Sequence, residues 1–228
     1  MTRIFISILF CLALPAIASS QAKAADRWQL EGTPGVVTQE IQFTSGDARL
    51  AGTVYLPARG ERLPAVVALH GASEPTRDAA LYRHLTEGLP AMGIAVLIYD
   101  RRGTGASSGS LGNINYEVLA DDAIAGQNAL AKLSRIDAAK IGFWGLSQGG
   151  WIAVLAAGRS KNAAFAIAVS APLVTPARQM DFATTNLLTL RGYSAGDVRQ
   201  MLEARKAWTG YLRGNNSRAA ALDKLRDA

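Results

Sequence analysis

The pentapeptide Gly-Leu-Ser-Gln-Gly at residues 145–149 restricts the fold of this chain more than any other feature. Residues 140–144 (Lys-Ile-Gly-Phe-Trp) are typical of a buried strand, and residues 150–157 form an apolar run typical of a helix that ends at Gly158. A strand, a sharp turn carrying a serine and a helix are the context of a nucleophile elbow. We therefore expect Ser147 to project its hydroxyl above a sheet.

Small residues have to flank such a serine, because the turn is strained and brings the strand and the helix close together. Gly145 and Gly149 meet that need and are expected to shape the elbow. The alternative is that Ser147 lies in an ordinary glycine-rich turn. The strand before it and the helix after it favour the elbow.

Composition is consistent with one globular α/β domain. The chain has 228 residues, of which 49% are hydrophobic and 18% charged, and it lacks the long polar or like-charged runs of a disordered protein. The net charge of +6 is scattered. Pairs such as Arg101-Arg102 and Arg205-Lys206 do not form the basic stripe of a nucleic-acid interface, so we expect no nucleic-acid partner.

Apolar runs alternate with helix-forming segments, which predicts a mostly parallel sheet with crossover helices. The expected strands are residues 36–44, 49–56, 64–71 (ending in a glycine loop), 94–100, 140–144 and 163–170. A turn at residues 45–47 would join the first two strands as an antiparallel hairpin. Two helices are expected to begin at the N-cap residues Asp78 and Asn115. The expected apolar stripe of the first helix comprises Leu81, Leu85, Leu89 and Met92.

Consecutive helices are expected after the last of these strands. Residues 180–191 predict one helix, and Ser194 with Asp197 predicts a capping box that begins a second. These helices indicate either the beginning of a cap over the active site or ordinary packing helices. We expect a core domain at residues 25–175 and an incomplete helical cap at residues 176–228.

The N-terminal segment, residues 1–24, has the order of a secretory signal peptide. Arg3 is followed by an apolar stretch at residues 4–14, too short to span a bilayer, and by a small-residue cleavage site at residues 22–24. A retained membrane anchor is the alternative. The only cysteine, Cys11, lies in this segment, so the mature chain would have no disulfide. We expect a periplasmic or secreted protein without a stable membrane anchor after cleavage.

Four features, taken in order, resemble the serine aminopeptidase and prolyl-oligopeptidase-related group of the α/β-hydrolase superfamily. They are His70-Gly71 after the third strand, residues 99–105 (Tyr-Asp-Arg-Arg-Gly-Thr-Gly) after the fourth, the pentapeptide at 145–149, and residues 170–172 (Ser-Ala-Pro) after the sixth. The resemblance covers roughly residues 36–210. It implies an α/β-hydrolase fold and cleavage of an ester or amide in a small-molecule or peptide substrate, without a cofactor. Neither the acyl group nor the oligomeric state is indicated.

Five residues take roles in this chemistry. Ser147 would attack a carbonyl carbon, and the oxyanion that forms needs two backbone N–H donors fixed in advance. The expected donors are the amide of Gln148, directly after the nucleophile, and the amide of Ala72, in the loop after the third strand. In the family that this chain resembles, the histidine before the glycine shapes that loop. His70 and Gly71 are therefore expected to shape the loop. The alternative for His70, which ends a strand near the expected position of Ser147, is that it is the base.

The sequence provides no expected base for Ser147. The only histidines, His70 and His84, precede the serine, whereas in α/β-hydrolases the acid and the histidine follow it. Asp181 and Asp197 follow it but lie in the expected cap. We therefore expect a C-terminally truncated, inactive chain whose triad acid and histidine lie outside it. The alternative is a non-catalytic hydrolase-fold protein that binds a ligand or partner through its pocket.

Other motifs indicate neither a cofactor nor a metal. The glycine-rich residues 103–109 lack the spacing and the directly following helix of a dinucleotide loop, and two distant histidines cannot build a typical zinc site. Asp100, Arg101 and Arg102 are expected to form an ion-pair cluster beneath the loop, with a substrate-carboxylate contact by one arginine as the alternative. The residues expected either at the mouth of the pocket or in solvated loop are Glu74, Arg77 and Asp78.

Overall fold

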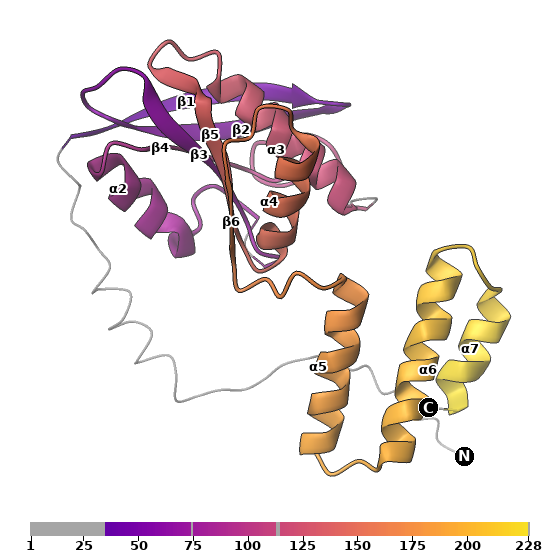
Figure 1. Cartoon of the computed structure of the whole chain (residues 1–228). Coiled ribbons are helices and arrows are strands. Elements are labelled where there is room, and N and C mark those ends of the chain that lie inside the picture. The colour runs from indigo at the N-terminus through magenta and orange to yellow at the C-terminus, as the bar shows by residue number, and fades with distance from the viewer. Residues whose placement is uncertain (1–34, 74, 113–114, 228) are drawn as a thin grey trace. The chain divides into compact units, whose positions relative to one another are not determined.

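The computed structural model contains two compact units that divide after Ala171, four residues before the expected boundary (Figure 1). The described residues are 35–73, 75–112 and 115–227. The expected signal peptide and Glu74 lie outside these residues.

The first unit contains a six-stranded sheet in the order β1-β2-β4-β3-β5-β6. The strands are β1 (Val36–Ser45), β2 (Ala48–Pro57), β3 (Leu63–Leu69), β4 (Ala95–Tyr99), β5 (Ile136–Leu146) and β6 (Ala166–Val169). The strands β1 and β2 form the expected antiparallel hairpin, and β2 also pairs antiparallel with β4. The four neighbouring strands β4, β3, β5 and β6 are parallel to one another. The predicted α/β-hydrolase fold, a mostly parallel sheet with crossover helices, is confirmed.

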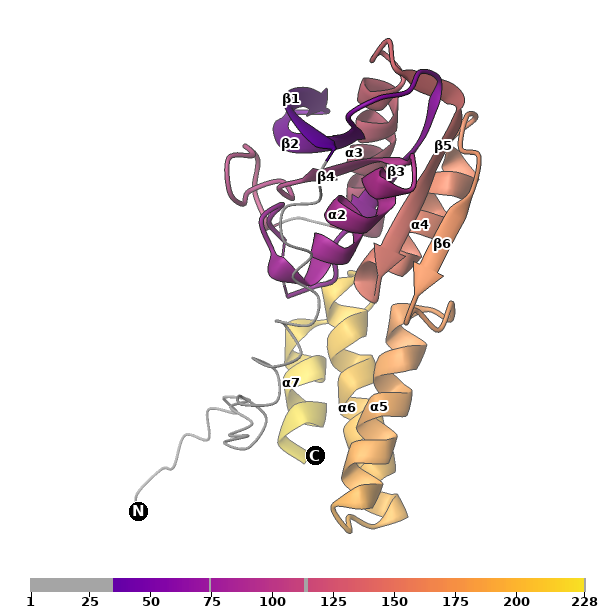
Figure 2. The ribbon, with the colours of Figure 1, turned by 90° about the vertical axis from the view of Figure 1, so that its left-hand side faces the viewer.

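Helices cover both faces of this sheet (Figure 2). On one face, α3 (Tyr116–Leu130) and α4 (Gln148–Arg159) bury an apolar cluster that includes Leu97 and Phe143. On the other face, the short 3-10 helix η1 (Ala80–Tyr82) and α2 (Arg83–Ala91) pack on a smaller cluster. The alternation of side chains along β3 explains the two clusters, because neighbouring residues of a strand point to opposite faces.

The strands differ in how deeply they are buried. Every residue of β4 is buried, as expected for the continuous apolar run at the centre of a parallel sheet. In contrast, β6 forms the edge of the sheet, and its residue Ile167 is 46% exposed. Among the described residues, no strand pairs with the outer edge of β6. A parallel strand with an open edge can pair with another strand.

Several helix boundaries differ from the prediction. The helix α4 begins at Gln148 and not at residue 150, and α5 begins at Pro176 and not at residue 180. Asp78 is not the N-cap expected for the first helix, because η1 intervenes and α2 begins at Arg83. Leu81 and Met92 of the expected stripe are exposed. The helix α4 does not end at Gly158 but continues to Arg159. Asn115, in contrast, caps α3 as expected, because its side chain accepts a hydrogen bond from the Val118 amide at 2.8 Å.

The second unit consists of three helices. They are α5 (Pro176–Leu190), α6 (Ala195–Leu212) and α7 (Arg218–Asp227). The expected capping box begins α6: the Ser194 hydroxyl accepts from the Asp197 amide at 3.2 Å, and the Asp197 carboxylate accepts from the Ser194 amide at 2.9 Å. In the part of the chain that the structure describes, no helix has both the length and the apolar character to cross a membrane.

Candidate active site

Ser147 lies in the turn between β5 and α4, with φ of 52° and ψ of −115°. A positive φ is uncommon for a residue with a side chain and costs about 1–3 kcal/mol, which the surrounding structure has to offset. Hydrogen bonds hold the turn on both sides. The Ser147 amide donates to the Val169 carbonyl of β6 at 2.8 Å, and the Gly150 amide donates to the Ser147 carbonyl at 2.9 Å. The serine is exposed, so its hydroxyl is accessible to a substrate.

Close backbone contacts explain the two glycines of the elbow. A Cβ at Gly145 would lie 1.9 Å from the Gly149 carbonyl oxygen. A Cβ at Gly149 would lie 2.2 Å from the carbonyl oxygen of Leu69, at the end of β3. No side chain fits at either position, because real Cβ atoms essentially never come closer than 3.0 Å to such atoms. The glycines therefore allow β5, α4 and β3 to meet beneath Ser147.

The loop after β3 passes beside the serine. A Cβ at Gly71 would be 3.9 Å from the Ser147 Cβ, and the Gly71 amide donates to the Tyr82 hydroxyl at 2.8 Å. Ala72 follows in exposed, irregular backbone. Gln148 is the first residue of α4, where backbone N–H groups have no acceptor within the helix. The structure thus places the loop that contains Ala72, one expected oxyanion donor, close to Ser147. Ser147 directly precedes Gln148, the other expected donor.

Arg101, in the loop after β4, joins these two segments from below. Its Nη2 donates to the carbonyl oxygens of His70 at 3.1 Å and Gly71 at 3.0 Å. Its Nη1 donates to Oε1 of Gln148 at 3.0 Å. The residue is buried, and burial lowers the pKa of its guanidinium. Arg101 is therefore not positioned to contact a substrate carboxylate.

His70 is buried beneath the loop and its ring is enclosed by aromatic residues. It packs edge-on against Tyr82, with 4.9 Å between ring centroids, and against Tyr99 at 6.4 Å. Burial, and secondly the charge of Arg101, lower the pKa of His70 to about 4, so the ring is neutral at physiological pH. Among the described residues, its Nε2 has no hydrogen-bond partner. These surroundings are typical of a packed, loop-shaping residue.

His84 lies on the exposed side of α2. Its Nδ1 is 2.9 Å from the Leu81 carbonyl oxygen, and its ring packs on Trp144 with 5.7 Å between centroids. Within the described residues, no hydrogen bond joins either histidine to the Ser147 hydroxyl. The described site therefore contains a strained serine and a neighbouring loop, without a paired base.

The model of the serine aminopeptidase S33 family of hydrolases matches residues 60–220, which include the loop after β3, the elbow and the first helices of the second unit. The chain belongs to this family.

Individual relatives and solved structures match this chain over only part of their length. An uncharacterized protein of Mycobacterium tuberculosis strain H37Rv is 33% identical over 111 residues, which are 49% of this chain and 37% of that protein. The match thus spans little more than a third of the curated relative. An esterase of Pyrococcus furiosus is 26% identical with a TM-score of 0.53, over 60% of this chain and 52% of that structure. An α/β hydrolase from Penicillium sp. sh18 is 25% identical with a TM-score of 0.55, over 68% and 53%.

The expected cluster of Asp100, Arg101 and Arg102 beneath this S33-family site is only partly correct. Arg102 pairs with the buried carboxylate of Asp122 at 2.6 Å. Asp100 accepts from the amides of Arg77 at 2.8 Å and Ala106 at 2.9 Å. The two arginines and Asp100 therefore point to different partners. Asp100 and the two arginines do not pair with one another, because adjacent residues of a chain that leaves a strand project in different directions.

The acidic residues of the second unit have local partners. Asp197 belongs to the capping box of α6, and Asp181 pairs with Arg205 at 3.3 Å. The Ser194 hydroxyl and amide lower the pKa of Asp197. Both carboxylates thus take part in contacts within the second unit.

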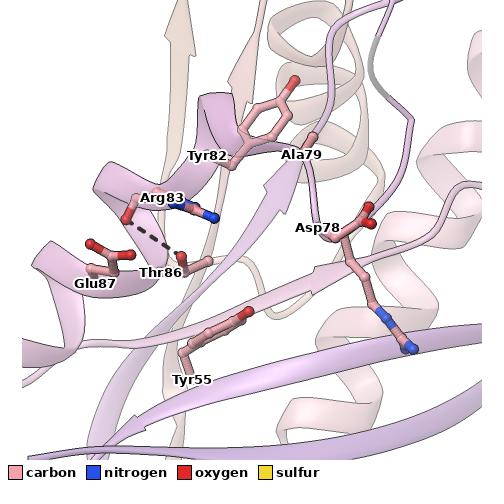
Figure 3. A pocket seen from close by; sticks show the side chains of 8 residues that line it. Tyr55, Asp78, Ala79, Tyr82, Arg83, Thr86 and Glu87 are labelled. Atoms are coloured by element: carbon pink, nitrogen blue, oxygen red, sulfur yellow. Dashed lines mark hydrogen bonds between the residues drawn. The ribbon is translucent and has the colours of Figure 1, made fainter. Parts of the chain in front are cut away.

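A cavity of about 220 Å³ lies on the α2 side of the sheet (Figure 3). Its lining residues are Tyr55, Arg77, Asp78, Ala79, Tyr82, Arg83, Thr86 and Glu87. Arg77 and Asp78, expected at a pocket mouth or in solvated loop, thus line this cavity. Tyr82 connects it to the site, because its hydroxyl binds the Gly71 amide. No sequence pattern indicated this role of Tyr82, which lies eleven positions after Gly71.

Metal binding has no support in the described part of the chain. Residues 35–73, 75–112 and 115–227 contain no group of three or more histidine, cysteine, aspartate or glutamate side chains that could hold an ion.

Proposed function

We propose that the protein is a serine hydrolase that cleaves an ester or amide through an acyl-enzyme on Ser147. The turn between β5 and α4 carries the proposal, because it holds Ser147 exposed at φ of 52° directly before the first residue of α4. Strained backbone is often found at active sites, and a strained serine between a strand and a helix is the arrangement of a nucleophile elbow. Membership of a serine aminopeptidase family supports the same chemistry.

The reaction would proceed in two acyl transfers. Ser147 Oγ attacks the carbonyl carbon of a small-molecule or peptide substrate while a base takes its proton. The carbonyl oxygen becomes an oxyanion, which the amides of Ala72 and Gln148 stabilise. Collapse of this intermediate releases the alcohol or amine with a proton and leaves an ester on Ser147. Water then attacks that ester through a second oxyanion and releases the acid.

The base is not provided by either histidine of the chain. His70 is enclosed by two tyrosines, and Nδ1 of His84 faces the Leu81 carbonyl oxygen. A serine hydroxyl is a poor nucleophile at neutral pH without a base. We therefore propose that this chain by itself hydrolyses esters slowly. A site without a triad member retains an acceleration of about 10³–10⁴ over water from the oxyanion hole and binding.

The test is covalent labelling of Ser147 by a fluorophosphonate, with and without added imidazole. In this reaction the Ser147 oxygen bonds to phosphorus, fluoride leaves, and the proton passes to a base. Imidazole has the same ring as histidine and can serve as a soluble base. Site-resolved mass spectrometry should detect slow labelling that accelerates with imidazole and disappears in Ser147→Ala.

Ser170→Ala is the matched control. Ser170 is also an exposed serine with positive φ, 53°, at the end of a strand. This variant should be labelled as the unsubstituted chain is. Labelling that survives Ser147→Ala, or no labelling at any imidazole concentration, would refute the nucleophile assignment. Rapid labelling without imidazole would instead show that the chain contains a base, with His70 the first residue to substitute.

A non-catalytic hydrolase-fold protein is the second candidate. The absence of a histidine paired with Ser147 among the described residues favours it. Such a protein would bind an ester or amide without reacting with it. Binding of a substrate analogue that is unchanged in Ser147→Ala, together with no labelling, would support this alternative.

We also propose that the protein is exported to the periplasm or secreted. The order of charged, apolar and small residues in the first 24 positions supports export. N-terminal sequencing of protein from the source cell envelope should give a mature chain that begins near Ala25. An intact Met1 in a cytoplasmic fraction would refute this proposal.

A further inference from the structure

Arg101 is a buried cation that the proposed reaction does not use directly. It is 8% exposed, and its guanidinium donates hydrogen bonds to three oxygen atoms on two separate segments. Burying a charged group is costly unless it is hydrogen-bonded. Two of the three acceptors belong to the loop after β3, and the third belongs to the residue after the nucleophile. The buried charge therefore lies between the two segments that carry the expected oxyanion donors.

We propose that Arg101 is a positioning residue that aligns both donors of the oxyanion hole. This inference rests on the proposed function of Ser147. Arg101 acts through Gly71 on the Ala72 amide and through the Gln148 side chain on the Gln148 amide. It does not touch the substrate.

The geometry of the peptide bond explains the first connection. The Gly71 carbonyl and the Ala72 amide belong to one planar peptide unit, in which C=O and N–H point in opposite directions. By binding the Gly71 oxygen at 3.0 Å, Arg101 fixes the plane and so directs the Ala72 N–H away from itself. A cation at the oxygen also polarises the unit, and polarised hydrogen-bonding groups are stronger donors.

The second connection runs through the side chain of Gln148. Its Oε1 accepts from Nη1 of Arg101 at 3.0 Å, which limits the rotation of the residue whose amide is the other donor. The guanidinium is planar, so the directions of its Nη1 and Nη2 donors are fixed relative to each other. Holding Gly71 and Gln148 by one rigid group therefore fixes the spacing of the two segments.

Further bonds of Arg101 hold the same loop. Its backbone amide donates to the Pro75 carbonyl at 2.8 Å, so the loop after β3 is attached at Pro75 as well as at His70 and Gly71. Arg102 provides a contrast. It is equally buried, 8% exposed, but it pairs with the Asp122 and Asp47 carboxylates and not with the loop. A substitution at Arg102 therefore serves as a control for the loss of a buried arginine that does not bind the loop after β3.

The experiment compares Arg101→Met and Arg101→Lys with Arg102→Met. For each protein, fluorophosphonate labelling of Ser147 in imidazole is followed over time at several probe concentrations. This gives the maximal labelling rate constant, the probe affinity and the final labelled fraction. Misfolding lowers the final fraction, whereas misaligned donors lower the maximal rate constant. The same proteins, labelled with ¹⁵N, report the environment of the Ala72 and Gln148 amides by NMR without any reaction.

Arg101→Met should lower the maximal rate constant about 10- to 100-fold with little change in probe affinity, a smaller effect than full removal of one donor. Arg101→Lys, which keeps the charge but not the fork, should recover part of this loss. Both should shift the amide resonances of Ala72 and Gln148. Arg102→Met should lower thermal stability while leaving the rate constant and these resonances unchanged.

Two outcomes would overturn the inference. One is a maximal rate constant in Arg101→Met equal to that in Arg102→Met. The other is a set of Ala72 and Gln148 resonances that moves no more in the Arg101 variants than in the control. Failure of the unsubstituted chain to label at Ser147 refutes the proposed function instead, and in that case the NMR comparison still decides whether Arg101 holds the two amides.

Discussion

Replacing Gly149 with alanine should separate α4 from the end of β3. The new Cβ would lie 2.2 Å from the Leu69 carbonyl oxygen and 2.8 Å from the His70 carbonyl oxygen. Because such contacts are essentially never shorter than 3.0 Å, backbone has to move by about 0.8 Å. Neither neighbour is a flexible side chain that could rotate away. The movement displaces the first turn of α4, which begins directly after Ser147.

The sign of the stability change makes this prediction informative. In a helix with free space around it, Gly→Ala stabilises by about 1 kcal/mol through propensity alone. Overpacking of a close contact lowers the free energy of unfolding by about 1–3 kcal/mol. Because Gly149→Ala has to displace backbone, we expect its overpacking cost to be at least about 3 kcal/mol. We therefore expect a net destabilisation of about 2 kcal/mol. For a chain of this length, that lowers Tm by about 4–8 °C.

Gly158→Ala provides a control in the same helix. A Cβ at Gly158 has no other atom within 4 Å, so this substitution should raise Tm by about 2–4 °C. Thermal unfolding followed by circular dichroism measures both variants. Fluorophosphonate labelling should be lost or strongly slowed only in Gly149→Ala. If both variants were stabilised alike, the close approach of α4 to β3 would be wrong.

Two further predictions concern buried charge. Folding lowers the pKa of His70 from 6.5 to about 4. Between these two pH values the unfolded chain binds a proton at His70 that the folded chain does not bind. The free energy of unfolding should therefore fall as the pH falls from 6.5 to about 4. His70→Gln should flatten that dependence in thermal unfolding. Arg102→Met leaves the fully buried Asp122 carboxylate without its 2.6 Å partner and should cost about 3–5 kcal/mol in denaturant unfolding. Asp121→Asn, at the exposed pair with Arg159, should cost less than about 1 kcal/mol, and similar costs for both would contradict the burial argument.

The elbow was predictable because its requirements are local. The strand, Ser147 and the flanking glycines occupy consecutive positions, and each glycine is needed for a contact within the same strand–turn–helix unit or its neighbouring strand. The capping residue Asn115 was predictable for the same reason, since its acceptor and donor are three residues apart. Short-range geometry is largely determined by the identity of neighbouring residues.

Tertiary contacts account for what the sequence did not indicate. Arg101 binds oxygens that are 30, 31 and 47 positions away, so its role depends on the path of three loops. The expected cap Asp78 failed because the 3-10 turn of η1 precedes α2. Gly158 was expected to end α4, but a glycine costs a helix only about 1 kcal/mol, and α4 continues past it to Arg159.

The hydrogen bonds of Arg101, which connect the loops after β3, β4 and β5, also limit how this scaffold can be re-engineered. A serine turn grafted into another sheet would bring its own glycines but not the guanidinium that enters from the loop after β4. Insertions in the segment around Arg101 would disturb the serine even though that segment contributes no reacting atom. Libraries intended to alter substrate preference are therefore better directed at residues other than Arg101 and its hydrogen-bond partners. Loop exchanges between homologues should transfer the segments after β3, β4 and β5 together.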